Sequence, residues 1–208
     1  MNMKAKNNNF NLTTKNLTLC ALLTALALGL SYLENLFPLA IAIPIPGVKL
    51  GLANIITLFA LYALNPAQAF MILISRCTLG ALFAGNLNAL IYSIFGGVSA
   101  LFVMMILSRT DLFSIYGVST GGAAAHNCGQ IAAAVFTLGN SAPLYYLPVL
   151  LFISLFTGAL TGLVSALLFR ALQNTGVPEF ARTETRNQNH LNPPPTDGQE
   201  ASHGKISD

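Results

Sequence analysis

The chain has 208 residues, of which 54% are hydrophobic and only 8% are charged, and its formal net charge is +3. A soluble domain carries roughly 25% charged residues, so this composition excludes an ordinary water-soluble fold. The positive residues are scattered along the chain, which does not indicate nucleic-acid binding. The apolar runs are continuous and about 20 residues long, whereas the strands of a membrane barrel are about 10 residues long and alternate. The sequence therefore predicts an all-α integral membrane protein.

The chain divides into three predicted parts. Residues 1–16 are polar, and the apolar run that follows has no clear A-x-A-like cleavage site, so we expect a cytoplasmic N-terminal segment and a retained first helix. Residues 17–172 form the predicted transmembrane domain, a single bundle of six helices. Apolar runs and Pro, Gly and Asn breakers place these helices at 17–37, 50–64, 67–85, 88–107, 118–138 and 144–172. The second is short for a full span. Residues 173–208 are polar and Pro-rich, which is typical of a disordered tail.

Arg76 lies about ten residues after Pro66, so we expect it near the middle of the third helix. An intramembrane Arg costs about 2.5–3.5 kcal/mol on insertion scales and is a functional-site hypothesis by default. Arg76 is therefore a candidate to meet an anionic ligand, or to bond backbone carbonyls and the amides of the fifth helix. A shallow Arg on a tilted helix is the alternative.

A second polar group interrupts the stretch "GGAAAHNCGQIAAA" in the fifth helix, where His126, Asn127 and Gln130 lie among small residues. His126 and Gln130 are four residues apart and share a helix face, with Asn127 beside it. Polar side chains in lipid must find partners. We interpret the three as the lining of a polar pocket that also contains Arg76. They would otherwise tie this helix to a neighbour by hydrogen bonds.

Lys49 and Asn54 open the predicted second helix, close to Gly47 and Gly51. A helix N-terminus carries partial positive charge and free N–H groups, so this segment is a candidate entrance that attracts anions. An ordinary interfacial Lys beside a capping loop is the alternative.

In the first helix, Ala21, Ala25 and Gly29 recur at four-residue spacing, a pattern that permits close helix contact within the bundle or with a partner. The three cysteines have no metal-binding spacing, and no metal site or cofactor is predicted. The chain contains no paired-aspartate, P-loop or GxSxG motif, so we expect neither catalytic residues nor nucleotide binding here.

Four blocks of the sequence resemble a known family. "PGVKLGLANIITLFALY", "RCTLGALFAGN", "SIFGGVSALFVM" and "GGAAAHNCGQIAAA" are similar to blocks of the Gx transporter family, also catalogued as heptaprenyl diphosphate synthase component I. The resemblance covers residues 17–172. The family is in turn similar to the substrate-binding S components of energy-coupling-factor transporters, which are six-helix membrane proteins.

This resemblance implies two functions. In the first, the chain is the substrate-binding component of an uptake transporter for a small anionic molecule. Ala21 and Ala25 would then dock on a transmembrane coupling subunit driven by ATPases. In the second, it is a membrane accessory subunit of heptaprenyl diphosphate synthase, in isoprenoid or quinone side-chain synthesis. Sequence reasoning favours the first, with Arg76, His126, Asn127, Gln130, Asn54 and Lys49 as substrate-binding residues.

The distribution of Lys and Arg predicts the topology of this multi-pass protein of the cytoplasmic membrane. With six spans, every Lys and Arg predicted outside the helices except Lys49 lies on one side, which we expect to be cytoplasmic. Both termini should therefore be cytoplasmic. A phosphatase or fluorescent-protein fusion at Ser207 checks this. A C-terminal reporter that is active only outside the cell would contradict it.

Overall fold

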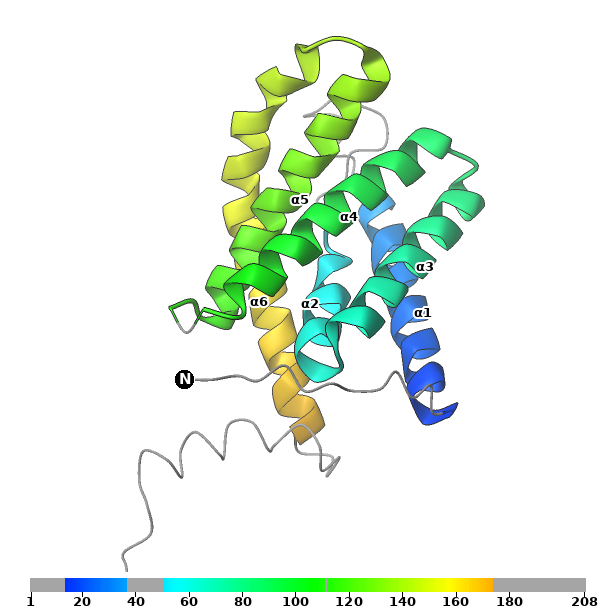
Figure 1. Ribbon diagram of the computed structural model, residues 1–208, viewed down its shortest axis with the longest axis vertical. Coiled ribbons are helices and arrows are strands. Elements are labelled where there is room, and N and C mark those ends of the chain that lie inside the picture. Colours follow the sequence, from blue (N-terminus) through cyan, green and yellow to red (C-terminus); the bar gives the residue numbers. More distant parts are fainter. Residues whose placement is uncertain (1–13, 37–50, 111, 174–208) are drawn as a thin grey trace, which may run out of the picture. The chain divides into compact units, whose positions relative to one another are not determined.

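The structure, a computed structural model, describes residues 14–36, 51–110 and 112–173, and all regular secondary structure in these ranges is helical (Figure 1). It comprises six α-helices and one short 3-10 helix, η2. They are α1 (Thr14–Leu36), α2 (Asn54–Ala63), α3 (Pro66–Ala84), α4 (Leu87–Leu107), α5 (Ile115–Leu138), η2 (Ala142–Tyr146) and α6 (Leu147–Gln173). The prediction of an all-α fold with six helices is confirmed. One compact unit contains every helix as far as Phe169, and residues 170–173 belong to a second unit.

α2 differs most from its predicted limits, and α6 also begins later than predicted. α2 begins at Asn54 rather than near residue 50, because Gly51 has φ of 85° and the Asn54 amide donates to the Gly51 carbonyl oxygen at 2.9 Å in a tight turn. α6 begins at Leu147 rather than near residue 144, because Pro143 lies in η2. The Asn–Pro and Gly–Asn breakers were predicted correctly. Asn65 caps α3 by accepting from the Gln68 amide at 2.9 Å, and Asn86 caps α4 in the same way.

Among the described residues, four helical segments are long and apolar enough to cross a membrane, namely 17–34, 66–84, 87–107 and 142–171. α2 is a shorter apolar helix of 10 residues. α5 has 24 residues but is not among the four, and its sequence contains His126, Asn127 and Gln130 among small residues. The chain is therefore a multi-pass membrane protein in which one short helix and one polar helix accompany four apolar spans.

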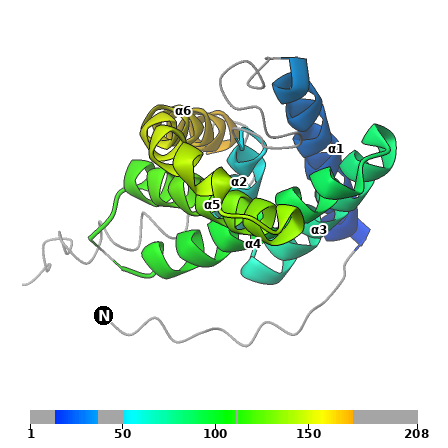
Figure 2. The ribbon, with the colours of Figure 1, turned by 90° about the horizontal axis from the view of Figure 1, so that it is seen from above.

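The short helix α2 lies at the centre of the bundle. Its residues from Asn54 to Ala60 are all buried, and it contacts α1, α3, α4 and α5. On a further side, the Ser165 hydroxyl of α6 donates to the Ile55 carbonyl oxygen of α2 at 3.3 Å. Figure 2 shows α2 between α1 and α6, with α3, α4 and α5 along its other side. The other helices of the bundle therefore pack around α2.

Glycines allow the other helices to approach closely. α4 and α5 are in extensive contact. A Cβ atom on Gly129 of α5 would lie 2.6 Å from the Phe95 carbonyl oxygen of α4. On α6, a Cβ atom on Gly158 would lie 2.5 Å from Thr120 Cα of α5. The glycines of α6 therefore serve packing inside the bundle.

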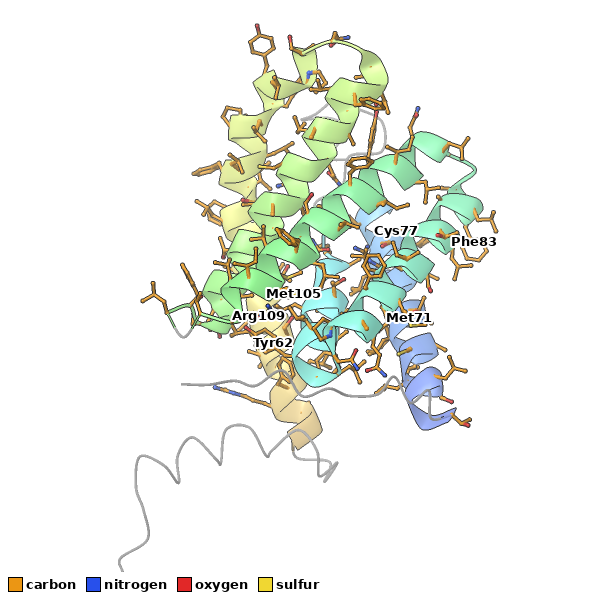
Figure 3. The ribbon with its side chains drawn as sticks, viewed as in Figure 1. Tyr62, Met71, Cys77, Phe83, Met105 and Arg109 are labelled. Atoms are coloured by element: carbon orange, nitrogen blue, oxygen red, sulfur yellow. The ribbon has the colours of Figure 1, made fainter. Side chains whose placement is uncertain are left out.

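The small residues of α1 have the opposite environment. Ala21, Ala25 and Gly29 are exposed, and a Cβ atom on Gly29 would meet no atom within 4 Å. Large apolar side chains are exposed elsewhere on the bundle, including Phe83, which points away from the outer edge of α3 and is 79% exposed (Figure 3). An apolar outer surface of this kind suits contact with lipid, and the stripe on α1 leaves space for another helix.

This contrast predicts different responses to added side-chain volume. Ala21→Leu/Ala25→Leu should leave the melting temperature of the purified protein in detergent nearly unchanged, because both positions face outward. Gly158→Ala should lower it, because its new methyl group would collide with the backbone of α5. Thermal unfolding followed by circular dichroism measures both. A double variant that unfolds as readily as Gly158→Ala would show that the α1 stripe is internal packing.

Candidate functional site

Arg76 and Asn54 face each other across the hairpin formed by α2 and α3. Each lies eleven residues from Asn65, and residues equidistant from the turn of an antiparallel hairpin come opposite one another. Arg76 Nη2 donates a hydrogen bond to Asn54 Oδ1 at 3.2 Å. Both side chains are buried, with exposed fractions of 6% and 3%. The guanidinium is therefore held inside the bundle by a neutral amide.

The helix geometry places this pair deep in the protein. Arg76 lies ten residues after Pro66, which at 1.5 Å per residue is about 15 Å along α3. A bilayer core is about 30 Å thick, so Arg76 lies near the middle of the span. Its burial differs from that of a shallow Arg that extends to the lipid head groups, the alternative raised by the sequence.

On α5, His126 and Gln130 form a second buried pair. Their Nε2 atoms lie 2.8 Å apart, in hydrogen-bond contact, and both residues are almost fully buried. Gly96 of α4 packs directly against them. A Cβ atom there would lie 2.8 Å from Gln130 Cγ and 3.0 Å from His126 Nδ1. The imidazole ring and the Gln130 side chain are therefore fixed against the α4 backbone.

Gly51 connects the two pairs. A Cβ atom on Gly51 would lie 3.0 Å from Asn54 Nδ2 and 3.3 Å from His126 Nε2, so both side chains border its Cα atom. The Gly51 amide also donates to Glu34 Oε1, a buried carboxylate near the end of α1. The next glycine of α4, Gly97, faces Arg76, since its Cβ atom would lie 3.4 Å from Nη2.

We call this connected group of residues from α1, α2, α3 and α5, with the turn before α2, the polar core. Its members are Glu34, Gly51, Asn54, Arg76, His126 and Gln130.

Two residues predicted for the site or for its entrance have other positions. Asn127 turns away from the pair on its own helix and donates from Nδ2 to the Leu150 carbonyl oxygen of α6 at 2.9 Å. Asn54 is buried against Arg76 and is not at an entrance. Lys49 lies outside the described residues, and Ala21 and Ala25 lie on the outer face of α1.

The backbone N–H groups at the start of α2, which the sequence predicted to be free, donate hydrogen bonds within the chain. The amides of Asn54, Ile55 and Ile56 donate to carbonyl oxygens three residues earlier, at 2.9–3.2 Å. Any attraction for an anion at this point must therefore come from side chains, chiefly Arg76 and Asn54.

Residues 23–168 match the family model described as heptaprenyl diphosphate synthase component I. The match covers well over half of the chain and includes the whole polar core. The chain belongs to this family. No curated protein and no solved structure matches the chain. Arg76, Asn54, His126 and Gln130 therefore lie together inside the part of the chain that matches the family model.

Sequence reasoning missed part of the polar core. Glu34 is absent from the predicted site, although an acidic side chain within an apolar run is itself a signal of a buried partner. Gly96 and Gly97 were not singled out, although they lie in one of the four resembling blocks. Their role depends on what crosses them, which a single sequence does not reveal.

The polar core contains donors that lack acceptors. Among the described residues, no hydrogen-bond partner reaches Asn54 Nδ2 or Arg76 Nε, and Thr57 Oγ1, one turn further along α2, has none either. The hydrogen bond that Arg76 donates within the described residues goes to the neutral Asn54 amide. A buried cation with spare N–H donors can hold an oxygen acceptor, above all an anionic one.

The close packing around His126 yields a prediction. Gly96→Ala should lower the free energy of unfolding by about 1–3 kcal/mol, because its methyl group must displace His126 or Gln130 from a filled space. Gly29→Ala, the matched control on α1, should have no effect or stabilise the helix slightly, because alanine is the better helix former. Unfolding in detergent measures both variants. Equal stability for the two would show that the α4 backbone does not hold the histidine in place.

Proposed function

We propose that the chain is a non-catalytic membrane component of isoprenoid diphosphate synthesis, which binds an amphipathic anion of the prenyl diphosphate type for a separate catalytic component. The observation that carries this proposal is Arg76, a buried cation near mid-span whose hydrogen bond within the described chain goes to a neutral amide. Membership of the component I family supports it, because the family name implies a partner component.

The physical properties of a prenyl diphosphate fit such a site. Its isoprenoid chain is apolar and partitions into a bilayer or against apolar helices, whereas its diphosphate carries negative charge. Arg presents several N–H donors in a rigid planar fork that suits phosphate oxygens, and a low-dielectric interior strengthens the attraction. In this proposal Arg76 balances the ligand's charge, and Asn54, His126 and Gln130 complete the polar surroundings. Lys49 belongs to the route of entry, and Asn127 supports the site by joining α5 to α6.

A second candidate function rests on a different observation. Ala21, Ala25 and Gly29 form an exposed stripe on α1 with open space beside it, as expected of a helix that docks on another membrane subunit. The chain would then be the substrate-binding component of an uptake transporter, with coupling and ATPase subunits as partners. Affinity purification from native membranes separates the two functions. Recovery of ATPases, lost in Ala21→Leu/Ala25→Leu, favours transport, and recovery of a soluble prenyl diphosphate synthase favours the first proposal.

Ligand binding tests the role of the polar core. Arg76→Ala should abolish binding of a radiolabelled prenyl diphosphate to the purified protein, because the buried cation that balances the ligand's charge is lost. His126→Ala should weaken binding by about 1–3 kcal/mol, the usual cost of removing one buried hydrogen-bonding partner.

Arg109→Ala is the matched control, since Arg109 is exposed just beyond the end of α4 (Figure 3). It should bind as the unmodified protein does. The site proposal fails if Arg76→Ala retains full affinity while folded, or if Arg109→Ala loses as much affinity as Arg76→Ala.

A further inference from the structure

We propose that the Asn54 amide occupies the place of a ligand oxygen on Arg76, and that an oxyanion group, a phosphate or a carboxylate, displaces it when a ligand binds. The inference rests on the proposed function, because it specifies the chemical group that the same site binds. Arg76 on α3 and Asn54 on α2 each have a buried hydrogen-bond donor without an acceptor among the described residues.

The Arg76 guanidinium uses only part of its hydrogen-bonding capacity. Nη2 donates to Asn54 Oδ1 at 3.2 Å, while Nε has no partner among the described residues. In an arginine, Nε and one Nη form a two-donor edge that accepts both oxygens of a carboxylate or phosphate. A single amide oxygen at the long end of hydrogen-bond distance is a weak substitute for such a group.

Asn54 has the complementary deficiency. Its Oδ1 accepts from Arg76, but its Nδ2 donates to nothing within the described ranges, although the residue is 3% exposed. Leaving a buried donor unsatisfied costs free energy. Because an amide carries an acceptor and a donor on opposite sides, rotation about its last side-chain bond exchanges them. After rotation, Nδ2 can donate to an oxyanion that has taken the place of Oδ1 on Arg76.

Both unsatisfied donors would gain an acceptor by this exchange. Arg76 would contribute two N–H groups and Asn54 one, and the ligand's charge would balance a buried cation. The glycines beside the pair let the backbone lie close to these atoms, since a Cβ atom would lie 3.0 Å from Asn54 Nδ2 at Gly51 and 3.4 Å from Arg76 Nη2 at Gly97. His126 and Gln130 bond each other and are held by Gly96, so they form a fixed wall of this oxyanion site.

Asn54→Asp tests the exchange directly, because it replaces the amide by a carboxylate of the same shape. The new carboxylate should pair permanently with Arg76, raise the melting temperature of the ligand-free protein, and reduce affinity for an added oxyanion by about 100-fold. Asn54→Leu removes the amide altogether. It should leave Arg76 available and reduce affinity only about 10-fold through the loss of one donor.

The probes are geranylgeranyl diphosphate, inorganic diphosphate, and nanodiscs of phosphatidylcholine with or without phosphatidylglycerol. Equilibrium binding and the melting temperature are measured for each variant. Stronger loss in Asn54→Asp than in Asn54→Leu, for whichever oxyanion binds, supports the exchange. Equal affinity of Asn54→Asp and the unmodified protein overturns the exchange. A greater loss of affinity in Asn54→Leu than in Asn54→Asp also overturns it. If Asn54→Asp does not fold, the exchange is overturned when Asn54→Leu binds none of the probes.

The outcomes with different probes distinguish failure of the inference from failure of the proposed function. If phosphatidylglycerol binds and depends on Asn54 as described, but geranylgeranyl diphosphate does not bind, the oxyanion site stands and the prenyl diphosphate function fails. If geranylgeranyl diphosphate binds equally to the Asn54→Asp variant, the function stands and the exchange at Asn54 fails. If the unmodified protein binds none of the probes, both are overturned.

Discussion

The hydrogen bond between Arg76 and Asn54 is the interaction on which the interior of this protein depends. A buried guanidinium near mid-span is shielded from bulk water, so the protein itself must supply most of its polar surroundings. The short helix α2 achieves this by starting inside the bundle, at the level of Arg76, instead of crossing fully. The turn at Gly51 then brings a peptide group and the Glu34 carboxylate to the same place. A full-length second helix would present another apolar face to Arg76.

Close backbone packing is the second requirement, because polar side chains can meet only if the helices that carry them approach closely. Gly96 and Gly97 lie on adjacent positions of α4 and face different neighbours, His126 with Gln130 on one side and Arg76 on the other. A helix with larger residues there would separate α3 from α5. The polar core would then divide into two groups that could not share a ligand. The polar residues of α3 and α5 therefore depend on the glycines of α4 to lie close together.

Much of this arrangement could be predicted from the sequence, because the signals are local and strong. A cation in an apolar run, two polar residues four positions apart and well-placed Asn and Gly breakers indicate buried polar faces and helix ends. The face that Asn127 adopts could not be predicted, since it depends on the Leu150 carbonyl oxygen of a helix far along the chain. The depth at which Asn54 lies could not be predicted for a similar reason. A sequence shows that a residue opens a helix, but only the hairpin shows that this helix opens at mid-span.

The first helix joins the outer surface to the polar core. Its outward face presents Ala21 and Ala25, whereas Glu34 on the same helix is buried and accepts from the Gly51 amide. Gly51 in turn borders both Asn54 and His126. A rigid helix that shifts against its neighbours moves both ends, so a partner that displaces α1 would also act on the residues around Arg76. In the proposed function, in which the chain binds an anion for another component, this property would be useful. Movement of α1 alone would then link contact with the partner to release of the ligand. No conformational change across the whole bundle would be needed.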